Sequence, residues 1–84
     1  MSENPTLLTI DDEEPFRRSI RGFFEDSGFE VWEAADGQEG LAIFRDRQPQ
    51  VVLVDLGMPG ISGLEVIQTL AAEAPEVPVV VLSG

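Results

Sequence analysis

Four short apolar runs alternate along the chain with three segments of helical periodicity, and this order constrains the fold more than any other feature. The runs are residues 6–10, 29–34, 51–54 and 79–82. A helix between successive strands returns the chain to the same end of a sheet, so these strands run parallel with right-handed crossovers. The sequence therefore predicts a single α/β domain with the order βαβαβαβ.

The segments between the runs predict three amphipathic helices. Pro15 suits the start of the first helix, Gly28 its end, Asp36 the N-cap of the second and Pro75 the end of the third. The expected apolar positions are Phe16, Ile20, Phe23 and Phe24, then Leu41, Ile43 and Phe44, and finally Leu64, Ile67, Leu70 and Ala71. The run at 29–34 begins with apolar and acidic residues in alternation, which predicts a strand near the sheet edge.

Composition excludes several classes of function. Sixteen acidic residues oppose five arginines, and the resulting net charge of −11 predicts no direct nucleic-acid contact and no membrane binding by this segment. The sequence has no Cys and no His, which excludes disulfides, thiol catalysis and imidazole chemistry. It shows no signal-peptide pattern and no apolar run of membrane-spanning length, so we expect a cytoplasmic location. We expect Arg17, Arg18 and Arg21 to form a solvated helix face, which is also the favoured contact for an acidic partner.

Acidic residues follow two of the apolar runs. Asp11 and Asp12 follow residues 6–10, and Asp55 follows residues 51–54. Ligands of open parallel sheets bind outside the carboxyl ends of the strands, so these carboxylates converge if the two strands are neighbours. Their repulsion requires a proton or a cation, and oxygen-only donors favour Mg²⁺. Simpler interpretations stay open: Asp11 and Asp12 cap a helix, and Asp55 is a solvated acid at a strand end.

Three further roles are open near this edge. Asp55 could be a nucleophile that forms an aspartyl phosphate, a metal ligand, or both. Gly57 would let a backbone carbonyl reach a metal without crowding, although a turn glycine is an equally simple interpretation. The Ser83 hydroxyl could donate to a phosphoryl oxygen, and a solvated serine is the alternative.

Taken together, these motifs make the sequence similar to the receiver (CheY-like) domain of two-component response regulators. The matching stretches are residues 7–13, 33–37, 52–60 and 78–84, which occur in this order and span nearly the whole chain. The resemblance implies a flavodoxin-like fold, with three α/β/α layers and a parallel sheet of strand order 2-1-3-4. Within the family, the sequence looks most like the receivers of RssB-type regulators, which control sigma-factor availability.

The resemblance also implies a role for each residue of the acidic edge. Asp55 would be the phosphoacceptor that takes a phosphoryl group from a sensor kinase histidine. Asp12 would bind Mg²⁺ directly, Asp11 would act largely through water, and Gly57 would offer its carbonyl. Ser83 would be the switch hydroxyl that moves toward the phosphoryl group.

One departure from the family concerns its fifth strand, which ends in a lysine and precedes a final helix. This sequence contains no lysine and ends after the fourth run. We therefore expect residues 1–84 to be the N-terminal, incomplete part of a receiver domain, whose run 79–82 forms an exposed sheet edge. Such an edge predicts a dimer or another intermolecular sheet contact. The other expected partners are a sensor histidine kinase or phosphotransfer protein and a C-terminal output domain or partner protein.

The predicted function is a phosphorylation-controlled switch rather than an enzyme that turns over a free substrate. One alternative is a Mg²⁺-dependent phosphohydrolase with an Asp nucleophile. Such enzymes usually carry a second acid two residues after the nucleophile, where this chain has Gly57. Another alternative is a degenerate receiver that acts only as a protein-binding module, which the absence of lysine makes credible for this fragment.

Overall fold

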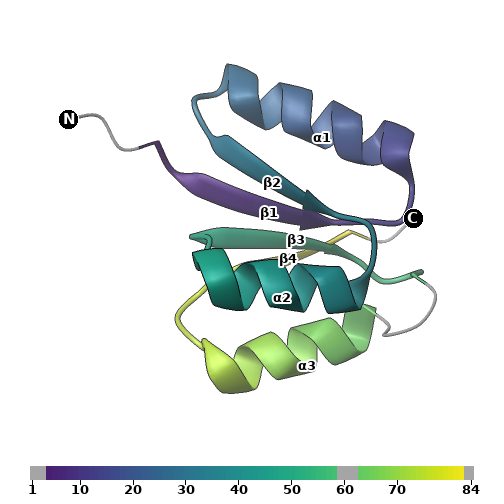
Figure 1. Cartoon of the computed structure of the whole chain (residues 1–84), viewed down its shortest axis with the longest axis vertical. Helices are drawn as coiled ribbons and strands as arrows, with labels where there is room; N and C mark the ends of the chain where they lie inside the picture. Colours follow the sequence, from purple (N-terminus) through teal and green to yellow (C-terminus); the bar gives the residue numbers. More distant parts are fainter. Residues whose placement is uncertain (1–3, 59–62, 83–84) are drawn as a thin grey trace.

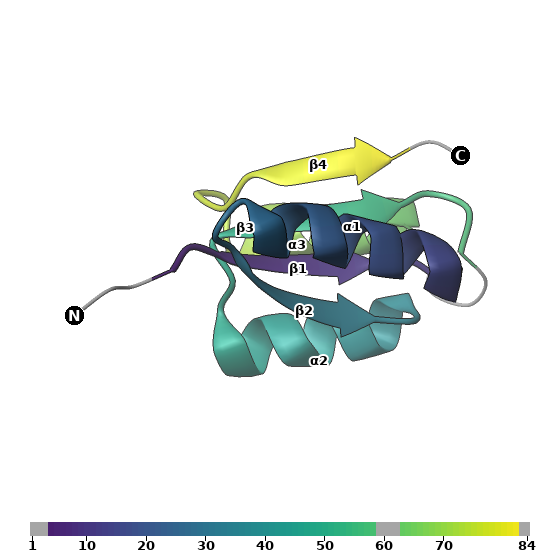
Figure 2. The same ribbon diagram turned by 90° about the horizontal axis from the view of Figure 1, so that it is seen from above.

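The structure is a computed structural model that describes residues 4–58 and 63–82. Its elements, in chain order, are β1 (Thr6–Ile10), α1 (Glu14–Asp26), β2 (Glu30–Ala34), α2 (Gly37–Arg47), β3 (Val51–Asp55), α3 (Gly63–Glu73) and β4 (Val79–Leu82). All neighbouring strands pair in parallel, in the order β2-β1-β3-β4, as Figure 2 shows from above. The predicted α/β fold and strand order are confirmed.

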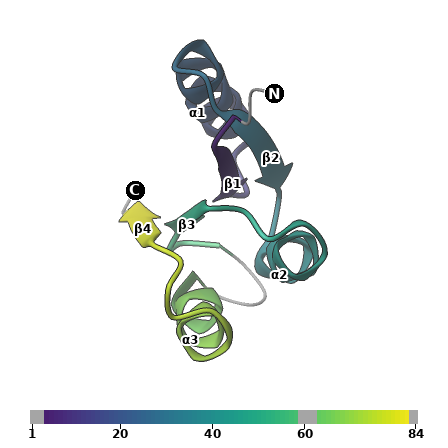
Figure 3. The same cartoon turned by 90° about the vertical axis from the view of Figure 1, so that its left-hand side faces the viewer.

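The helices form two layers around this sheet. Helix α1 covers one face, over β1 and β2, and α2 and α3 cover the other face (Figures 1 and 3). The central strands β1 and β3 are thereby apolar on both sides, which explains their continuous hydrophobic runs. No helix within residues 4–58 and 63–82 combines the length and the apolar character needed to cross a lipid bilayer.

The core divides into two clusters because successive strand residues point to opposite faces. The larger cluster lies against α2 and α3 and includes Leu8, Ile10, Leu41, Phe44, Val52, Val54, Val66 and Leu70. The smaller cluster lies against α1 and comprises Leu7, Val31 and Leu53, with Ile20 and Phe24 of the helix packed on it. The strand predictions therefore identified the residues that hold the sheet between its helices.

Two helices bury less of their predicted apolar face than expected. No residue of α1 is buried, and Phe16 and Phe23 are 41% and 66% exposed, because α1 covers only half of its sheet face. In α3 the buried side chains are those of Val66 and Leu70, whereas Leu64 is 57% exposed. The prediction was therefore wrong for part of both stripes.

The helix ends follow the predicted local chemistry. Asp36 caps α2, because its carboxylate accepts a hydrogen bond of 2.8 Å from the Glu39 N–H. Gly28 follows α1 with a φ of 95°, in the left-handed region that glycine adopts without strain. These two residues mark the start of α2 and the end of α1, and so the short connections on either side of β2.

Gly63 begins α3 in direct contact with the end of β3. A Cβ atom at this position would lie 2.7 Å from Leu56 Cα and even closer to the Asp55 carbonyl oxygen. These neighbours are backbone atoms, which cannot move aside as a flexible side chain does. Only glycine therefore lets α3 start this close to Asp55.

We expect Gly63→Ala to destabilise the fold by about 1–3 kcal/mol, because the added methyl overpacks a backbone contact. Gly22→Ala is the matched control: Gly22 lies inside α1, and a Cβ there would meet nothing within 4 Å. That control should stabilise the protein by about 0.4–1 kcal/mol through the lower entropy of its unfolded chain. Urea denaturation of the three proteins measures both changes. Equal stability of the Gly63→Ala variant and the parent would contradict the close approach of Gly63 to the backbone of Asp55 and Leu56.

Candidate metal centre at the carboxyl edge of the sheet

The three predicted acidic residues lie together at the carboxyl edge of the sheet. Strand β1 pairs with β3 so that Ile10 is opposite Val54, which brings the next residues, Asp11 and Asp55, to the same level. One carboxylate oxygen from each of Asp11, Asp12 and Asp55 lies within 4.8 Å of the other two. The structure thus contains the convergence that the sequence predicts.

Asp11 is held by hydrogen bonds on all sides. The residue is only 2% exposed. Its N–H donates to the Ala34 carbonyl at 3.0 Å, and its Oδ1 accepts from the Glu13 N–H at 2.8 Å. Its own carbonyl oxygen accepts from Arg17 Nη1 at 2.7 Å. One carboxylate oxygen therefore has a fixed backbone partner, and the position of the whole residue is set by the surrounding chain.

The electrostatics of the cluster disfavour three bare carboxylates. Burial raises the pKa of Asp11 above its ordinary value of 3.8, and the neighbouring charges of Asp55 and Asp12 raise this pKa further. The Glu13 N–H and, to a smaller extent, the Arg17 charge act in the opposite direction on this pKa. The result is an excess of negative charge that a bound cation would offset.

The donor set fits a hard divalent ion. All three side chains offer oxygen, and their exposure is graded: Asp11 is buried, Asp55 is half-buried and Asp12 is exposed. Mg²⁺ usually takes one or two carboxylates and keeps several waters, which an open position such as that of Asp12 allows. The residues present are therefore suited to Mg²⁺.

Helix capping explains little of this arrangement. The residue at the N-cap of α1 is Glu13, whose side chain makes no capping hydrogen bond. The Asp11 carboxylate accepts the N–H of that N-cap residue rather than an N–H within the helix. Capping also gives no reason for Asp55 to lie in the same cluster, so it does not account for the convergence of the three acids.

The loop after β3 is tied to both Asp55 and β4. The Asp55 Oδ1 accepts from the Gly57 N–H at 3.1 Å, and the Leu56 N–H donates to the Leu82 carbonyl at 3.3 Å. The predicted carbonyl ligand, Gly57, therefore lies in an exposed turn beside Asp55. Ser83, the predicted switch hydroxyl, lies outside the described residues.

Sequence reasoning missed Arg17. This residue was expected on a solvated face, but its side chain is only 14% exposed and contacts both Asp11 and Glu33. Arg18 fits the expectation, with a side chain that is 74% exposed. The acid at position 33 of the edge strand was the available clue, since buried guanidinium groups require an anionic partner.

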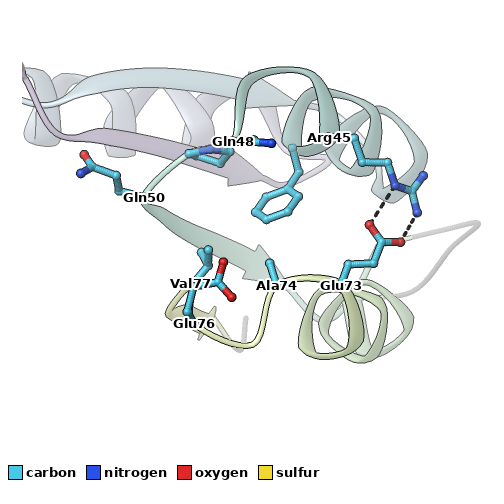
Figure 4. Close-up of a pocket in the computed structure, with 9 residues that line it drawn as sticks. Arg45, Gln48, Gln50, Glu73, Ala74, Glu76 and Val77 are labelled. Carbon is cyan, nitrogen blue, oxygen red and sulfur yellow. Dashed lines mark hydrogen bonds and ion pairs between the residues drawn. The ribbon is translucent and has the colours of Figure 1, made fainter.

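A groove lies at the opposite end of the sheet. It has a volume of about 600 Å³ and is lined by residues near the C-terminal ends of α2 and α3, including Phe44, Ala74 and Val77. Arg45 and Glu73 form an ion pair at its rim (Figure 4). The groove therefore belongs to the amino end of the strands and takes no part in the acidic cluster.

The fold and the acidic edge together define a flavodoxin-like domain with a cluster of carboxylates at the carboxyl edge of its sheet. A family model described as the response regulator receiver domain matches residues 7–84, and the chain belongs to this family. The photosynthetic apparatus regulatory protein RegA of Rhodovulum sulfidophilum is 38% identical over 84 residues, which are 100% of this chain and 46% of RegA. The phosphate regulon transcriptional regulatory protein PhoB of Pseudomonas aeruginosa is 35% identical and aligns with 94% of this chain and 35% of PhoB.

Solved structures agree with this assignment. A receiver domain protein of Clostridium thermocellum matches with a TM-score of 0.91 and 33% identity, over 95% of this chain and 65% of that one. The response regulator TrrA of Thermotoga maritima, in complex with Mg²⁺-BeF, matches with a TM-score of 0.91 and 30% identity, over 94% of this chain and 69% of TrrA. The chain spans less than half the length of RegA and PhoB and about two thirds of these two solved chains.

The raised pKa of Asp11 predicts how the metal-free protein responds to pH. The pKa of this carboxyl is higher in the folded state than its value of 3.8 in the unfolded chain. Between these two pKa values the folded state binds more protons than the unfolded state, so the free energy of unfolding falls as pH rises from 3.8 through the folded-state pKa. Asp11→Asn removes the buried charge and keeps an oxygen for the Glu13 N–H. The variant should therefore be more stable than the parent at pH 7, and this advantage should vanish at pH values below 3.8.

Urea denaturation at a series of pH values, with a chelator present, measures this effect. Asp46→Asn is the matched control, because Asp46 is an exposed acid of α2 far along the chain from the cluster. A difference between the Asp11→Asn variant and the parent that does not change with pH would contradict the electrostatic origin.

Proposed function

We propose that the chain is a phosphoacceptor receiver domain that Asp55 phosphorylation switches between two signalling states. The phosphoryl group would come from a histidine of a sensor kinase or phosphotransfer protein. The observation that carries the proposal is the approach of three carboxylate oxygens to within 4.8 Å at the carboxyl edge, with Asp55 among them. The family of the chain supports the same role.

In phosphoryl transfer, one residue of the chain would act as the nucleophile and others would hold the metal ion. A carboxylate oxygen of Asp55 forms the new bond to phosphorus, the bond from phosphorus to the histidine nitrogen breaks, and that nitrogen keeps the electron pair. Asp11, Asp12, Asp55 and the Gly57 carbonyl would hold Mg²⁺. When bound, Mg²⁺ supplies positive charge that reduces the repulsion between the phosphoryl oxygens and the carboxylates.

Ser83 and the surface around it would transmit the phosphorylation state of Asp55 to a partner. Its hydroxyl would donate to a phosphoryl oxygen on Asp55 and so shift the end of β4. RegA and PhoB are named as regulatory proteins, which supports a C-terminal output domain or partner protein as the recipient. The proposal also includes a cytoplasmic location and the resemblance to RssB-type receivers.

The two alternatives make different demands on the same site. A phosphohydrolase would need a second acid near the nucleophile, and position 57 is glycine. A receiver that only binds proteins would not need the carboxylates to converge. The convergence of the three acids favours the phosphoacceptor.

Incubation of the full chain with acetyl phosphate and Mg²⁺ tests the proposal. We expect intact mass to show one added phosphoryl group per chain, and Asp55→Asn to abolish the addition because the amide is a poor nucleophile. Asp46→Asn, an exposed acid elsewhere, should be labelled like the parent. Many equivalents of released phosphate would instead identify a hydrolase. No labelling of the parent would leave the protein-binding module as the function.

A sheet contact through β4 is the second part of the proposal. In the described residues β4 pairs with β3 alone, and Val80 and Val81 are 46% and 44% exposed. The carbonyls of Pro78 and Leu82 accept hydrogen bonds from Val52 of β3 and from Leu56, which follows β3. Val79 and Val81 therefore direct their backbone groups to the open edge. We propose that a second copy of the chain pairs along this edge.

Val81→Pro should convert such a dimer into a folded monomer, because proline removes an N–H from the open edge and none from the pairing with β3. Val81→Thr is the control, since threonine keeps both the N–H and the β-branched shape. Sedimentation at several concentrations measures the change. Higher salt should strengthen the dimer, because each chain carries a net charge of −11. A parent chain that is monomeric at every concentration would exclude the contact.

A further inference from the structure

Arg17 connects the acidic cluster to the edge strand of the sheet. Its Nη1 donates to the Asp11 carbonyl at 2.7 Å, and its Nε donates to Glu33 Oε1 at 3.2 Å. The guanidinium thus joins the residue after β1 to a side chain of β2. Because the group is planar and rigid, fixing one donor on Glu33 also fixes the direction of the other.

The Asp11 carbonyl belongs to the peptide that links Asp11 to Asp12. Its orientation sets the direction in which the following residue leaves β1, and therefore where the Asp12 carboxylate lies relative to Asp55. The Asp11 N–H and carboxylate already have backbone partners in Ala34 and Glu13. Arg17 is the side chain that fixes the remaining group of this residue.

Glu33 is a firm anchor for this contact. Its two carboxylate oxygens are occupied separately, Oε1 by Arg17 and Oε2 by Arg21 Nη1 at 2.9 Å. Hydrogen bonds from Arg21, and to a smaller extent from Arg17, lower the pKa of Glu33 and keep it ionised. Arg21 shares this anchor, but its Nε donates to Glu25 at 2.8 Å rather than to Asp11. Arg17 is therefore the arginine that connects Glu33 to Asp11.

We propose that Arg17 is a positioning residue of the metal centre, which holds the peptide between Asp11 and Asp12 in the orientation that binds Mg²⁺. This inference rests on the proposed function. Residues that orient the ligands of a metal typically contribute about 10–100-fold to its affinity. A purely electrostatic role makes the opposite prediction, since removal of a positive charge next to a cation site would tighten binding.

Titration of the ¹⁵N-labelled full chain with Mg²⁺, followed by amide NMR, tests the inference. Arg17→Met should weaken Mg²⁺ binding by about 10–100-fold. Arg17→Lys keeps the charge but cannot span both acceptors with a rigid fork, so it should also bind more weakly than the parent. In the metal-free spectra both variants should shift the Asp12 amide, whose N–H belongs to the peptide that Arg17 contacts.

Arg18→Met is the control, because it removes a guanidinium from the same helix that contacts Glu14 rather than Asp11 or Glu33. This variant should bind Mg²⁺ like the parent. Equal affinity in the Arg17→Met and Arg18→Met variants, or tighter binding in the former, would overturn the positioning role and leave the proposed function intact. Failure of the parent itself to bind Mg²⁺ would reject the proposed function and the inference together.

Discussion

Parallel pairing of β1 with β3 is the interaction on which the acidic site depends. The register that places Ile10 opposite Val54 carries the chain into Asp11 and Asp55 at the same level. Both strands are apolar on both faces, with Leu8 and Val54 in one cluster and Leu7 and Leu53 in the other. A slip by one residue would exchange these faces and separate the acids, so core packing fixes the geometry of the charges.

The same geometry imposes an electrostatic cost at the carboxylate cluster. Burial and the charges of two neighbouring acids disfavour an ionised Asp11, and this cost exists whenever the cluster holds no cation. A backbone hydrogen bond to the Asp11 carboxylate and the contact of Arg17 with the Asp11 carbonyl hold this residue in place despite the repulsion. A site that is held in place without its ion binds that ion without first having to be rearranged, which is the advantage of a preformed centre.

Sequence reasoning reached the strands and the three acids, because alternation of apolar runs and helices leaves few topologies. The strand order came from the resemblance to receiver domains. Sequence reasoning did not reach Arg17, whose role depends on Glu33, a residue 16 positions later that only the pairing of β2 brings close. It also misjudged the stripe of α1, since periodicity identifies an apolar face without showing how much of it a neighbour covers. Phe23 is 66% exposed for this reason. Long-range contacts of this kind are not encoded in local spacing.

The proposed partner surface and the proposed phosphorylation site share one connection. The Leu56 N–H, which follows Asp55 directly, donates to the Leu82 carbonyl at the end of β4, and this bond of 3.3 Å lies at the long end of the range for amides. A phosphoryl group on Asp55 would add negative charge within one residue of that bond. A displacement of Leu56 would therefore act on the end of β4 through this hydrogen bond, as well as on β3 through the chain itself. The end of β4 is accordingly coupled directly to the proposed phosphorylation site.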